Sequence, residues 1–356
     1  MEKEFKLQRF ITLRYADPIC AIDLTDKFLV YGTMLGTAAC YLINQKKIIT
    51  LSETQDEHIS GVEIQESKDN SKENKIYICI GDDRIFEFNS ITENYNDIPK
   101  YEVISNYTNS NEHFQFCDKC YTMLKNHYLV RTFIEFQGNN ENKDSNGIVD
   151  TKFIIKKLTN LSEPDITGEI KMSNYSVPFD FDGSNYIFID FLDEKIIRRK
   201  FNIYDLNSRS TKLSFDIENN KEKIGHISLL KILTNDLMFL VRDYNICEIR
   251  DFNFGLKRAF NLKGNEILAF DVFYSDENNF ETLKIIVLDL NGNVILYDYR
   301  NNKQEFLFNM NNLEVDQIIK DQKFFSMGYP YYIKVSKQYM AISSDYGCVL
   351  IHHSPF

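Results

Sequence analysis

The chain contains no tryptophan in its 356 residues, and it has no apolar run near the 18 residues that a membrane-spanning helix requires. Its first ten residues, MEKEFKLQRF, lack the apolar core of a signal peptide, which argues against secretion. Positive charge is the minority sign, with 41 Lys and Arg against 52 Asp and Glu. The resulting net charge of −11 repels phosphate backbones and anionic lipids. We therefore expect a cytoplasmic protein, including cytoskeletal or ciliary settings, with no direct nucleic-acid binding and no membrane insertion.

Cysteine occurs seven times, an odd number scattered through strand-like segments. This usage fits reduced and mostly buried thiols in a cytosolic protein. The hydrophobic share is 43%, with 14% aromatic residues, which is enough for a sizeable core and excludes global disorder.

Short runs of β-forming residues, separated by turn residues, predict an antiparallel meander near the N-terminus. The predicted strands are residues 19–24, 28–31, 38–43 and 48–51. Four such strands make about one blade of a β-propeller. We found one stretch with helical spacing, residues 309–325, where a short, weakly amphipathic helix is expected.

A repeat of about 46 residues runs through the chain. The clearest marks are Asp205, Asp251 and Asp298, which lie 46 and 47 residues apart and each follow an alternating strand-like run. We expect each mark to close the third strand of a blade. The full series of marks is Asn44, Asn89, Thr159, Asp205, Asp251, Asp298 and His353. Asp-Gly in 181–184 and Asn-Gly in 290–293 add hairpin signals.

The repeat predicts an all-β fold, a seven-bladed β-propeller of four-stranded antiparallel blades in a single domain. Only three strands follow the sixth mark, so we expect a strand in residues 1–14 to complete the last blade and close the ring. Two segments exceed the repeat, a polar insertion at 138–149 and a connection at 309–325, and both are candidate contact segments for partners. The expected blades are 15–57, 58–110, 111–172, 173–222, 223–264, 265–308 and 326–356.

These marks resemble the WD-repeat family. The family's Trp-Asp pair is similar to Tyr204-Asp205 and Tyr297-Asp298, and Arg250 stands in the tryptophan position of the blade between them. Its Gly-His pair resembles Gly225-His226, with a partial copy at Glu57-His58. Its turn aspartate is similar to Asp243, Asp289, Asp345 and Asp83. The resemblance implies a buried hydrogen-bond set that locks each blade, and a mostly non-enzymatic role in assembling other proteins.

A metal-like spacing, H-x3-C-x2-C-x6-H, is formed by His113, Cys117, Cys120 and His127. The two cysteines lie in a predicted first strand, where simple alternation would send them to opposite faces, so no metal site is expected. The stretch 180–185 and the trio Asp289, Asn291 and Asn293 only partly match a calcium loop, and hairpin turns explain both. We predict no catalytic, cofactor-binding or metal-binding residue.

Three function classes follow from a propeller without a catalytic motif. The first is a scaffold or adaptor subunit in a multiprotein assembly, which the acidic surface and polar insertions favour. The second is a module that captures a peptide or a modified side chain at the mouth of the propeller funnel. The third is a propeller hydrolase, which would need convergent carboxylates or histidines in the channel. We therefore expect a scaffold or adaptor.

Overall fold

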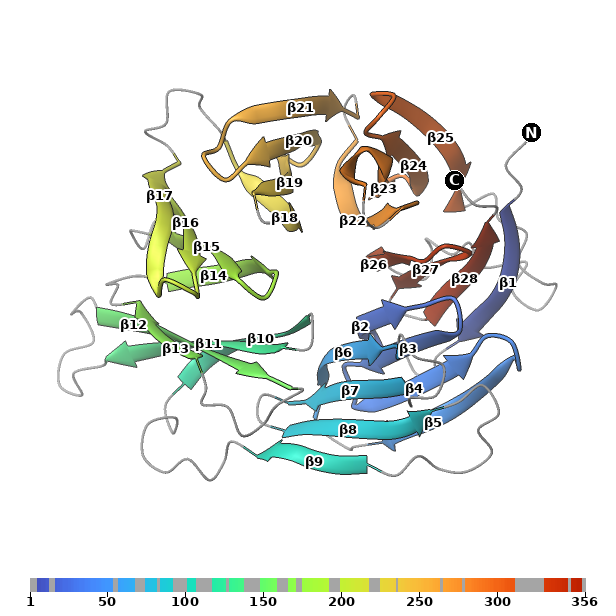
Figure 1. The fold of residues 1–356 in the computed structure, drawn as a ribbon. Helices are drawn as coiled ribbons and strands as arrows, with labels where there is room; N and C mark the ends of the chain where they lie inside the picture. The colour runs from blue at the N-terminus through green and yellow to red at the C-terminus, as the bar shows by residue number, and fades with distance from the viewer. Residues whose placement is uncertain are drawn as a thin grey trace. The chain divides into compact units, whose positions relative to one another are not determined.

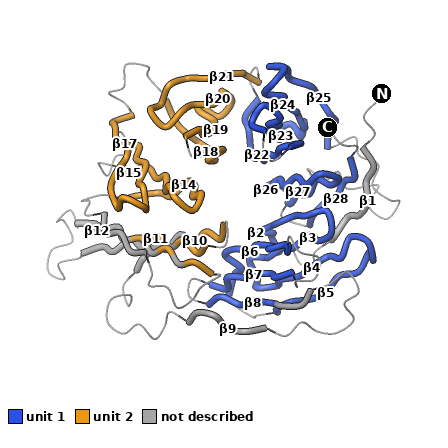
Figure 2. Tube along the Cα trace, viewed as in Figure 1, with its two compact units in different colours: residues 1–106, 265–356 blue, residues 107–264 orange. Residues whose placement is uncertain are grey.

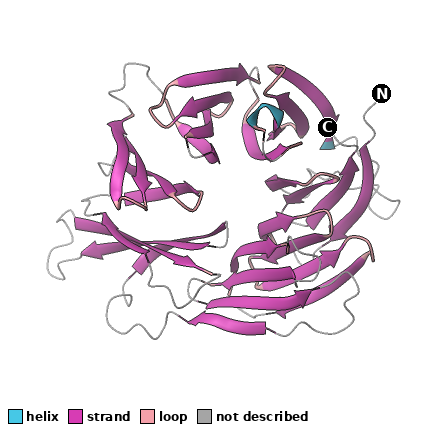
Figure 3. Ribbon diagram, in the orientation of Figure 1, coloured by secondary structure: helices cyan, strands magenta, loops and turns pink. Residues whose placement is uncertain are grey.

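A computed structural model of the chain describes the residues that follow. They are 5–12, 17–53, 57–67, 74–81, 84–91, 101–106, 117–125, 128–137, 148–158, 166–170, 175–191, 199–217, 225–234, 236–262, 265–276, 279–310, 330–344 and 347–353. Within them the chain forms 28 β-strands and the short 3-10 helix Phe280–Thr282. Figure 3 colours strands magenta and helical residues cyan. No helix in this described part is long and apolar enough to cross a membrane.

The strands form seven four-stranded antiparallel sheets (Figure 1). The chain divides into two compact units, residues 1–106 with 265–356 and residues 107–264 (Figure 2). The single domain remains a prediction. The insertion residues 138–147 and most of the 309–325 connection, with its predicted helix, lie outside the described residues.

Unit 1 contains four of the sheets. The first is β2 (Ile19–Leu24), β3 (Phe28–Thr33), β4 (Thr37–Leu42) and β5 (Lys47–Glu53). The second is β6 (Ile59–Gln65), β7 (Asn74–Ile80), β8 (Arg84–Ile91) and β9 (Tyr101–Asn106). The third is β22 (Ile267–Tyr274), β23 (Leu283–Asp289), β24 (Asn293–Asp298) and β25 (Lys303–Asn309), with the 3-10 helix η2 (Phe280–Thr282) before β23. The fourth is β1 (Phe5–Thr12), β28 (Gly347–His353), β27 (Tyr339–Ser344) and β26 (Pro330–Val335).

Unit 2 contains the other three sheets. The first is β10 (Cys117–Lys125), β11 (Tyr128–Gln137), β12 (Ile148–Lys157) and β13 (Ile166–Ile170). The second is β14 (Tyr175–Phe181), β15 (Asn185–Phe191), β16 (Arg199–Asp205) and β17 (Ser210–Asp216). The third is β18 (Ile227–Thr234), β19 (Leu237–Arg242), β20 (Ile246–Asp251) and β21 (Leu256–Asn261).

Several strand predictions are confirmed. The four strands of the N-terminal meander occur as β2 to β5. Asp205, Asp251 and Asp298 are each the last residue of the third strand of their sheets. The glycines of both predicted hairpins have positive φ, +100° at Gly183 and +81° at Gly292, as those turns require.

The core lies between neighbouring sheets. The β2–β5 sheet packs on one face against β6 to β8 and on the other against β27 and β28, so β3 is buried at every position. A strand covered on both faces reads as a continuous apolar run, which explains the segment FLVYGT. Gly32 lies where this packing is tightest, because an added Cβ would come within 2.2 Å of Ile59 Cγ2. Any side chain at position 32 would push the two sheets apart.

Neighbouring sheets are also joined by a recurring side-chain bond. In three sheets an aspartate of the first strand accepts a hydrogen bond from a backbone N–H of the first strand in the next sheet. The donors and acceptors are Ile64 N to Asp23 Oδ2 (2.8 Å), Ile232 N to Asp180 Oδ2 (2.6 Å) and Val335 N to Asp271 Oδ2 (2.9 Å). Two of these aspartates also face a lysine from the first strand of another adjacent sheet, Lys334 of β26 at Asp23 and Lys125 of β10 at Asp180. These hydrogen bonds and ion pairs therefore fix the spacing of adjacent sheets.

The N-terminal strand completes the C-terminal sheet. Strand β1 pairs antiparallel with β28, with Phe5 opposite His353 and Thr12 opposite Gly347. This pairing covers the edge that the last three strands would otherwise leave open. Closure of a complete ring by the same strand remains a prediction.

Deletion of residues 1–14 should therefore expose the edge of β28 and lower the melting temperature or cause aggregation. Thermal unfolding and size-exclusion chromatography would measure both effects. Deletion of residues 1–4, which precede β1, is the matched control and should leave both unchanged. A monomeric 1–14 deletion with the wild-type melting temperature would contradict the role assigned to β1.

A polar ladder crosses the β14–β17 sheet. Ser176 Oγ donates to Asp190 Oδ1 and Asn202 Nδ2 donates to Asp190 Oδ2, both at 2.5 Å, and Ser214 Oγ donates to Asn202 Oδ1 at 2.7 Å. Asp190 has no exposed surface, and this burial raises its pKa to about 6 against the hydrogen bonds that lower it. Ionised Asp190 therefore lowers the stability of the folded state, because its charge is buried.

Asp190→Asn should remove this cost, because an amide can satisfy the same two neighbours without a charge. Because the pKa of Asp190 is raised in the folded state, the folded protein binds more protons than the unfolded chain between about pH 4 and 6. The stability that protonated Asp190 contributes is therefore fully present below about pH 4 and is lost as the pH rises through about 6. The variant should gain up to about 2–3 kcal/mol over wild type at pH 7 and little at pH 4. Urea unfolding at both pH values measures this, and an equal difference at the two values would refute it.

Candidate functional site

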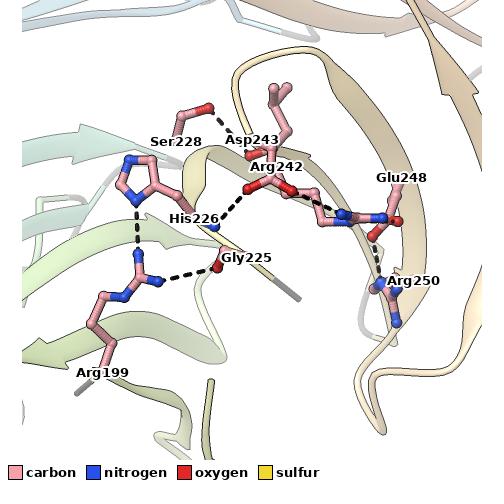
Figure 4. A network of polar contacts seen from close by, with 9 residues as sticks. Arg199, Gly225, His226, Ser228, Arg242, Asp243, Glu248 and Arg250 are labelled. Carbon is pink, nitrogen blue, oxygen red and sulfur yellow. Dashed lines mark hydrogen bonds and ion pairs between the residues drawn. The ribbon is translucent and has the colours of Figure 1, made fainter. Parts of the chain in front are cut away.

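The most developed polar network among the described residues lies in unit 2, around the turn between β19 and β20 (Figure 4). It begins at Arg199, the first residue of β16, and reaches Gly225 and His226, which precede β18. It continues through Arg242 and Asp243 at the end of β19. The network therefore connects the β14–β17 sheet with the β18–β21 sheet.

The link between the two sheets is a guanidinium–imidazole hydrogen bond. Arg199 Nη1 lies 2.8 Å from His226 Nδ1, and Arg199 Nη2 donates to Gly225 O at 3.3 Å. A guanidinium can only donate, so Nδ1 of His226 must be the acceptor and its proton must sit on Nε2. Burial and the Arg199 charge lower the pKa of His226, and the Asp243 carboxylate opposes them in part. His226 is accordingly neutral at pH 7.

Asp243 fastens the β19–β20 turn to the residue before β18. Its Oδ1 accepts from the backbone N–H of His226 at 3.0 Å, and its own N–H donates to His226 O at 2.7 Å. Arg242 Nη1 donates to Asp243 Oδ2 at 2.9 Å. Gly225 is required beside this carboxylate, because its φ is +72° and an added Cβ would lie 2.3 Å from Asp243 Oδ1.

The Gly-His pair and the turn aspartate of the WD resemblance therefore do meet in this sheet. The buried form implied by the resemblance is wrong here, because Asp243 is exposed and contacts the backbone of His226, while the ring bonds Arg199 instead. The β22–β25 sheet has a buried version, in which Asn265 replaces the histidine. Its fully buried Asp289 accepts from Asn265 Nδ2 (2.6 Å), Asn291 N (3.0 Å), Asn293 N (2.8 Å) and Asn293 Nδ2 (2.8 Å). Asp345 and Asp83 lie outside the described residues.

A buried ion pair supports the network from within the sheet. Glu248 and Arg250, both in β20, are buried, and Arg250 Nε donates to Glu248 Oε2 at 2.7 Å. Arg242 Nε donates to the other oxygen of Glu248 at 2.9 Å. Arg250 also donates to Phe254 O at 2.7 Å and stacks over the Phe254 ring at 4.7 Å. An arginine on an aromatic ring thus fills the position where the WD-repeat family places tryptophan. The sequence hint for Glu248 was a charge inside the apolar strand ICEIRD.

The two calcium-like stretches are hydrogen-bonded turns. The carboxylate of Asp182 accepts from Ser184 N and Asn185 N, each at 2.7 Å, and from Asn185 Nδ2 at 2.9 Å. The carboxylate of Asp289 accepts the amide hydrogen bonds described above. The acidic oxygens of both stretches are therefore engaged within the protein. Asp182 is bonded by its own turn, Asp180 by Ile232 N and Lys125, and Asp289 by its turn and by Asn265.

The structure describes only two of the four residues in the metal-like spacing. Cys117 and Cys120 lie in β10, the first strand of its sheet as predicted, whereas His113 and His127 lie outside the described residues. A β-bulge between Cys117 and Lys119 interrupts the strand register. The absence of a metal site at these four residues remains a prediction. Among described residues no cluster of three or more metal-binding side chains forms.

Large apolar side chains are exposed at the turns between second and third strands. Tyr244 is 47% exposed in the β19–β20 turn, Leu290 is 40% exposed in the β23–β24 turn, and Met34 and Leu35 are 50% and 57% exposed in the β3–β4 turn. These are the turns of this type for which the structure describes every residue. Such residues at the ends of rigid sheets can bind another protein but supply no reactive group.

Tyr244 and its neighbour have an unusual backbone. Asp243 and Tyr244 have φ values of +49° and +66°, two consecutive left-handed residues of which neither is glycine. This conformation is uncommon outside glycine and costs on the order of 1 kcal/mol or more per residue. The hydrogen bonds to His226 and the His226–Tyr244 ring contact at 5.2 Å hold the turn in place.

No protein-family model and no curated protein sequence matches the chain. Solved structures do match it along nearly its whole length. The computationally designed Ika8 protein aligns over 98% of this chain and 99% of its own, with 9% identity and a TM-score of 0.51. The WD40 β-propeller domain of Doa1 aligns over 99% of this chain and 97% of its own, with 8% identity and a TM-score of 0.55. At these identities the likeness shows a WD40-like propeller fold and does not assign the chain to the family.

Gly225→Ala should destabilise unit 2 by about 1–3 kcal/mol, because the methyl group collides with Asp243 and the left-handed backbone disfavours alanine. Gly183→Ala is the matched control. Its φ of +100° carries the backbone penalty, but its added Cβ would be at 3.5 Å from Tyr128, an ordinary contact. Urea unfolding should show a greater loss for Gly225→Ala, and equal losses would mean that Asp243 imposes no constraint.

Proposed function

We propose that the protein is a non-catalytic scaffold that binds other proteins through the turns between the second and third strands of its sheets. The observation that carries this proposal is the exposure of Tyr244, Leu290, Met34 and Leu35 at those turns. Partner contacts commonly centre on aromatic and large apolar side chains with arginine nearby. The β19–β20 turn offers this combination, because Tyr244 lies beside Arg242 and the Arg199–His226 pair.

The fold supports the same role. WD40-like propellers are commonly protein-interaction modules, and each turn here is mounted on a sheet with a fully packed interior. We also propose that the seven sheets form a closed ring with β1 as the closing strand, which the pairing of β1 with β28 supports. A rigid support of this kind reduces the entropy lost when a partner binds.

The proposed setting is a multiprotein assembly in the cytoplasm, including cytoskeletal or ciliary assemblies. The five cysteines whose side chains the structure describes form no disulfide, and four of them are buried. Burial raises the pKa of Cys40, Cys247 and Cys348 well above the ordinary value, so these thiols are unreactive. Unpaired, unreactive thiols suit a reducing compartment.

Tyr244→Ser tests the proposal most directly, with Leu256→Ser as the matched control. Leu256 is 50% exposed, like Tyr244, but lies on the outer strand β21. Partners would be identified by affinity purification from the native source and then measured with purified components. We expect at least one partner to lose about tenfold in affinity, near 1.4 kcal/mol, with Tyr244→Ser and none with Leu256→Ser.

The Leu290→Ser variant and the Met34→Ser, Leu35→Ser double variant extend the test to unit 1. All variants should keep the wild-type melting temperature, because the substituted side chains are exposed. If every partner binds all turn variants as tightly as wild type, these turns are not the contact surface. Loss of the same partner with Leu256→Ser would place the contact on the outer strands instead.

A further inference from the structure

We propose that the Arg199–His226 hydrogen bond is a pH-sensitive clasp between the β14–β17 and β18–β21 sheets, and that its opening on acidification releases the Asp243–Tyr244 turn. That this release weakens partner binding rests on the function proposed above. The clasp itself is a property of the isolated protein and does not depend on that function.

The clasp works only with a neutral imidazole. Nδ1 of His226 can accept from Arg199 Nη1, at 2.8 Å, only while it carries no proton. Protonation converts Nδ1 into a donor that faces another donor, and it also sets two positive charges against each other. The hydrogen bond then becomes a repulsion, so the ring must leave Arg199 when it takes up a proton.

The charged groups around His226 do not compensate for that repulsion. Arg199 faces it from β16, Asp243 from the β19–β20 turn, and Arg242 lies behind Asp243. Asp243 Oδ1 is already bonded to the backbone N–H of His226, and Oδ2 is bonded to Arg242 at 2.9 Å. Glu248, further along, is engaged by Arg242 and Arg250. Within the described part of the chain, the ring therefore faces one guanidinium, that of Arg199, and one carboxylate, that of Asp243, which is already hydrogen-bonded.

Opening of the clasp reaches the turn through three contacts. His226 N donates to Asp243 Oδ1 at 3.0 Å, Asp243 N donates to His226 O at 2.7 Å, and the Tyr244 ring centre lies 5.2 Å from that of His226. The turn needs such support, because both Asp243 and Tyr244 have left-handed backbones. A displaced His226 removes the ring contact and weakens the two backbone bonds. The expected result is local loosening at Tyr244 without global unfolding.

The direction of the pH effect follows from the lowered pKa of His226. Above the ordinary histidine value of about 6.5 the ring is neutral in both folded and open states, so the clasp is fully present. As the pH falls below that value, the open state binds the proton first, and stability is lost until the folded pKa is passed. The sensitive range therefore lies on the acid side of pH 6.5.

The experiment uses the full-length protein without a partner. Ring carbons of its six histidines are followed by NMR from pH 7.5 to 5, with His226 assigned by its absence from His226→Gln. Hydrogen exchange of peptides covering 225–228 and 240–246 is measured at pH 5.5 and 7.5, after correction for intrinsic rates. We expect His226 to titrate below 6.5 and the wild-type peptides to lose protection at pH 5.5.

Two variants separate the clasp from general acid effects. His226→Gln can accept from Arg199 through its amide oxygen and cannot titrate, so its protection should be the same at both pH values. Arg199→Gln keeps a donor for Nδ1 but removes the opposing charge, so His226 should titrate closer to the ordinary value. Titration of wild-type His226 at or above 6.5 would overturn the proposal, and this measurement needs no variant to fold. Equal loss of protection in His226→Gln and wild type would overturn it as well.

The two proposals can fail separately. If the clasp titrates as expected but Tyr244→Ser binds every partner normally, the clasp stands and the contact surface is wrong. If Tyr244→Ser loses a partner at pH 7.5 while exchange at 225–228 and 240–246 is independent of pH, the contact stands and the clasp is wrong.

Discussion

The arrangement of neighbouring sheets depends on one kind of hydrogen bond. In it, an aspartate carboxylate of one sheet accepts from a backbone N–H of the next sheet. Asp23, Asp180 and Asp271 each make it from a first strand, where apolar packing alone would allow sliding. Hydrophobic contact is non-directional, so it fixes how much surface is buried but not the register of one sheet on the next. A charge-assisted hydrogen bond is directional and strong enough to fix that register.

In the β18–β21 sheet, directed polar contacts also occur at the position that the resemblance assigns to tryptophan. The Arg250 guanidinium stacks on the Phe254 ring, and it also donates hydrogen bonds to Glu248 and to Phe254 O. Buried ion pairs contribute little net stability compared with apolar packing, because both charges lose their hydration. Their value here is specificity, since Glu248 is satisfied only when Arg242 and Arg250 both reach it.

Local sequence was enough to predict the strands, because period-two alternation and turn residues act within a few positions. Asp205, Asp251 and Asp298 were placed correctly for this reason. The contacts between strands were not predictable in the same way. Nothing near Asp190 indicates that Asn202 and Ser176 will reach it, and nothing near Asn265 indicates that it replaces a histidine at Asp289. The β-bulge after Cys117 likewise depends on its pairing with β11.

The left-handed turn at Asp243 and Tyr244 has a consequence for any attempt to engineer the protein. Glycine at position 244 would relieve backbone strain, so a search for stabilising substitutions would select it early. That substitution would also delete the exposed ring that stands beside His226. The turn is thus a place where stability and recognition compete, and a thermostable design that ignores the competition would lose the feature it set out to preserve.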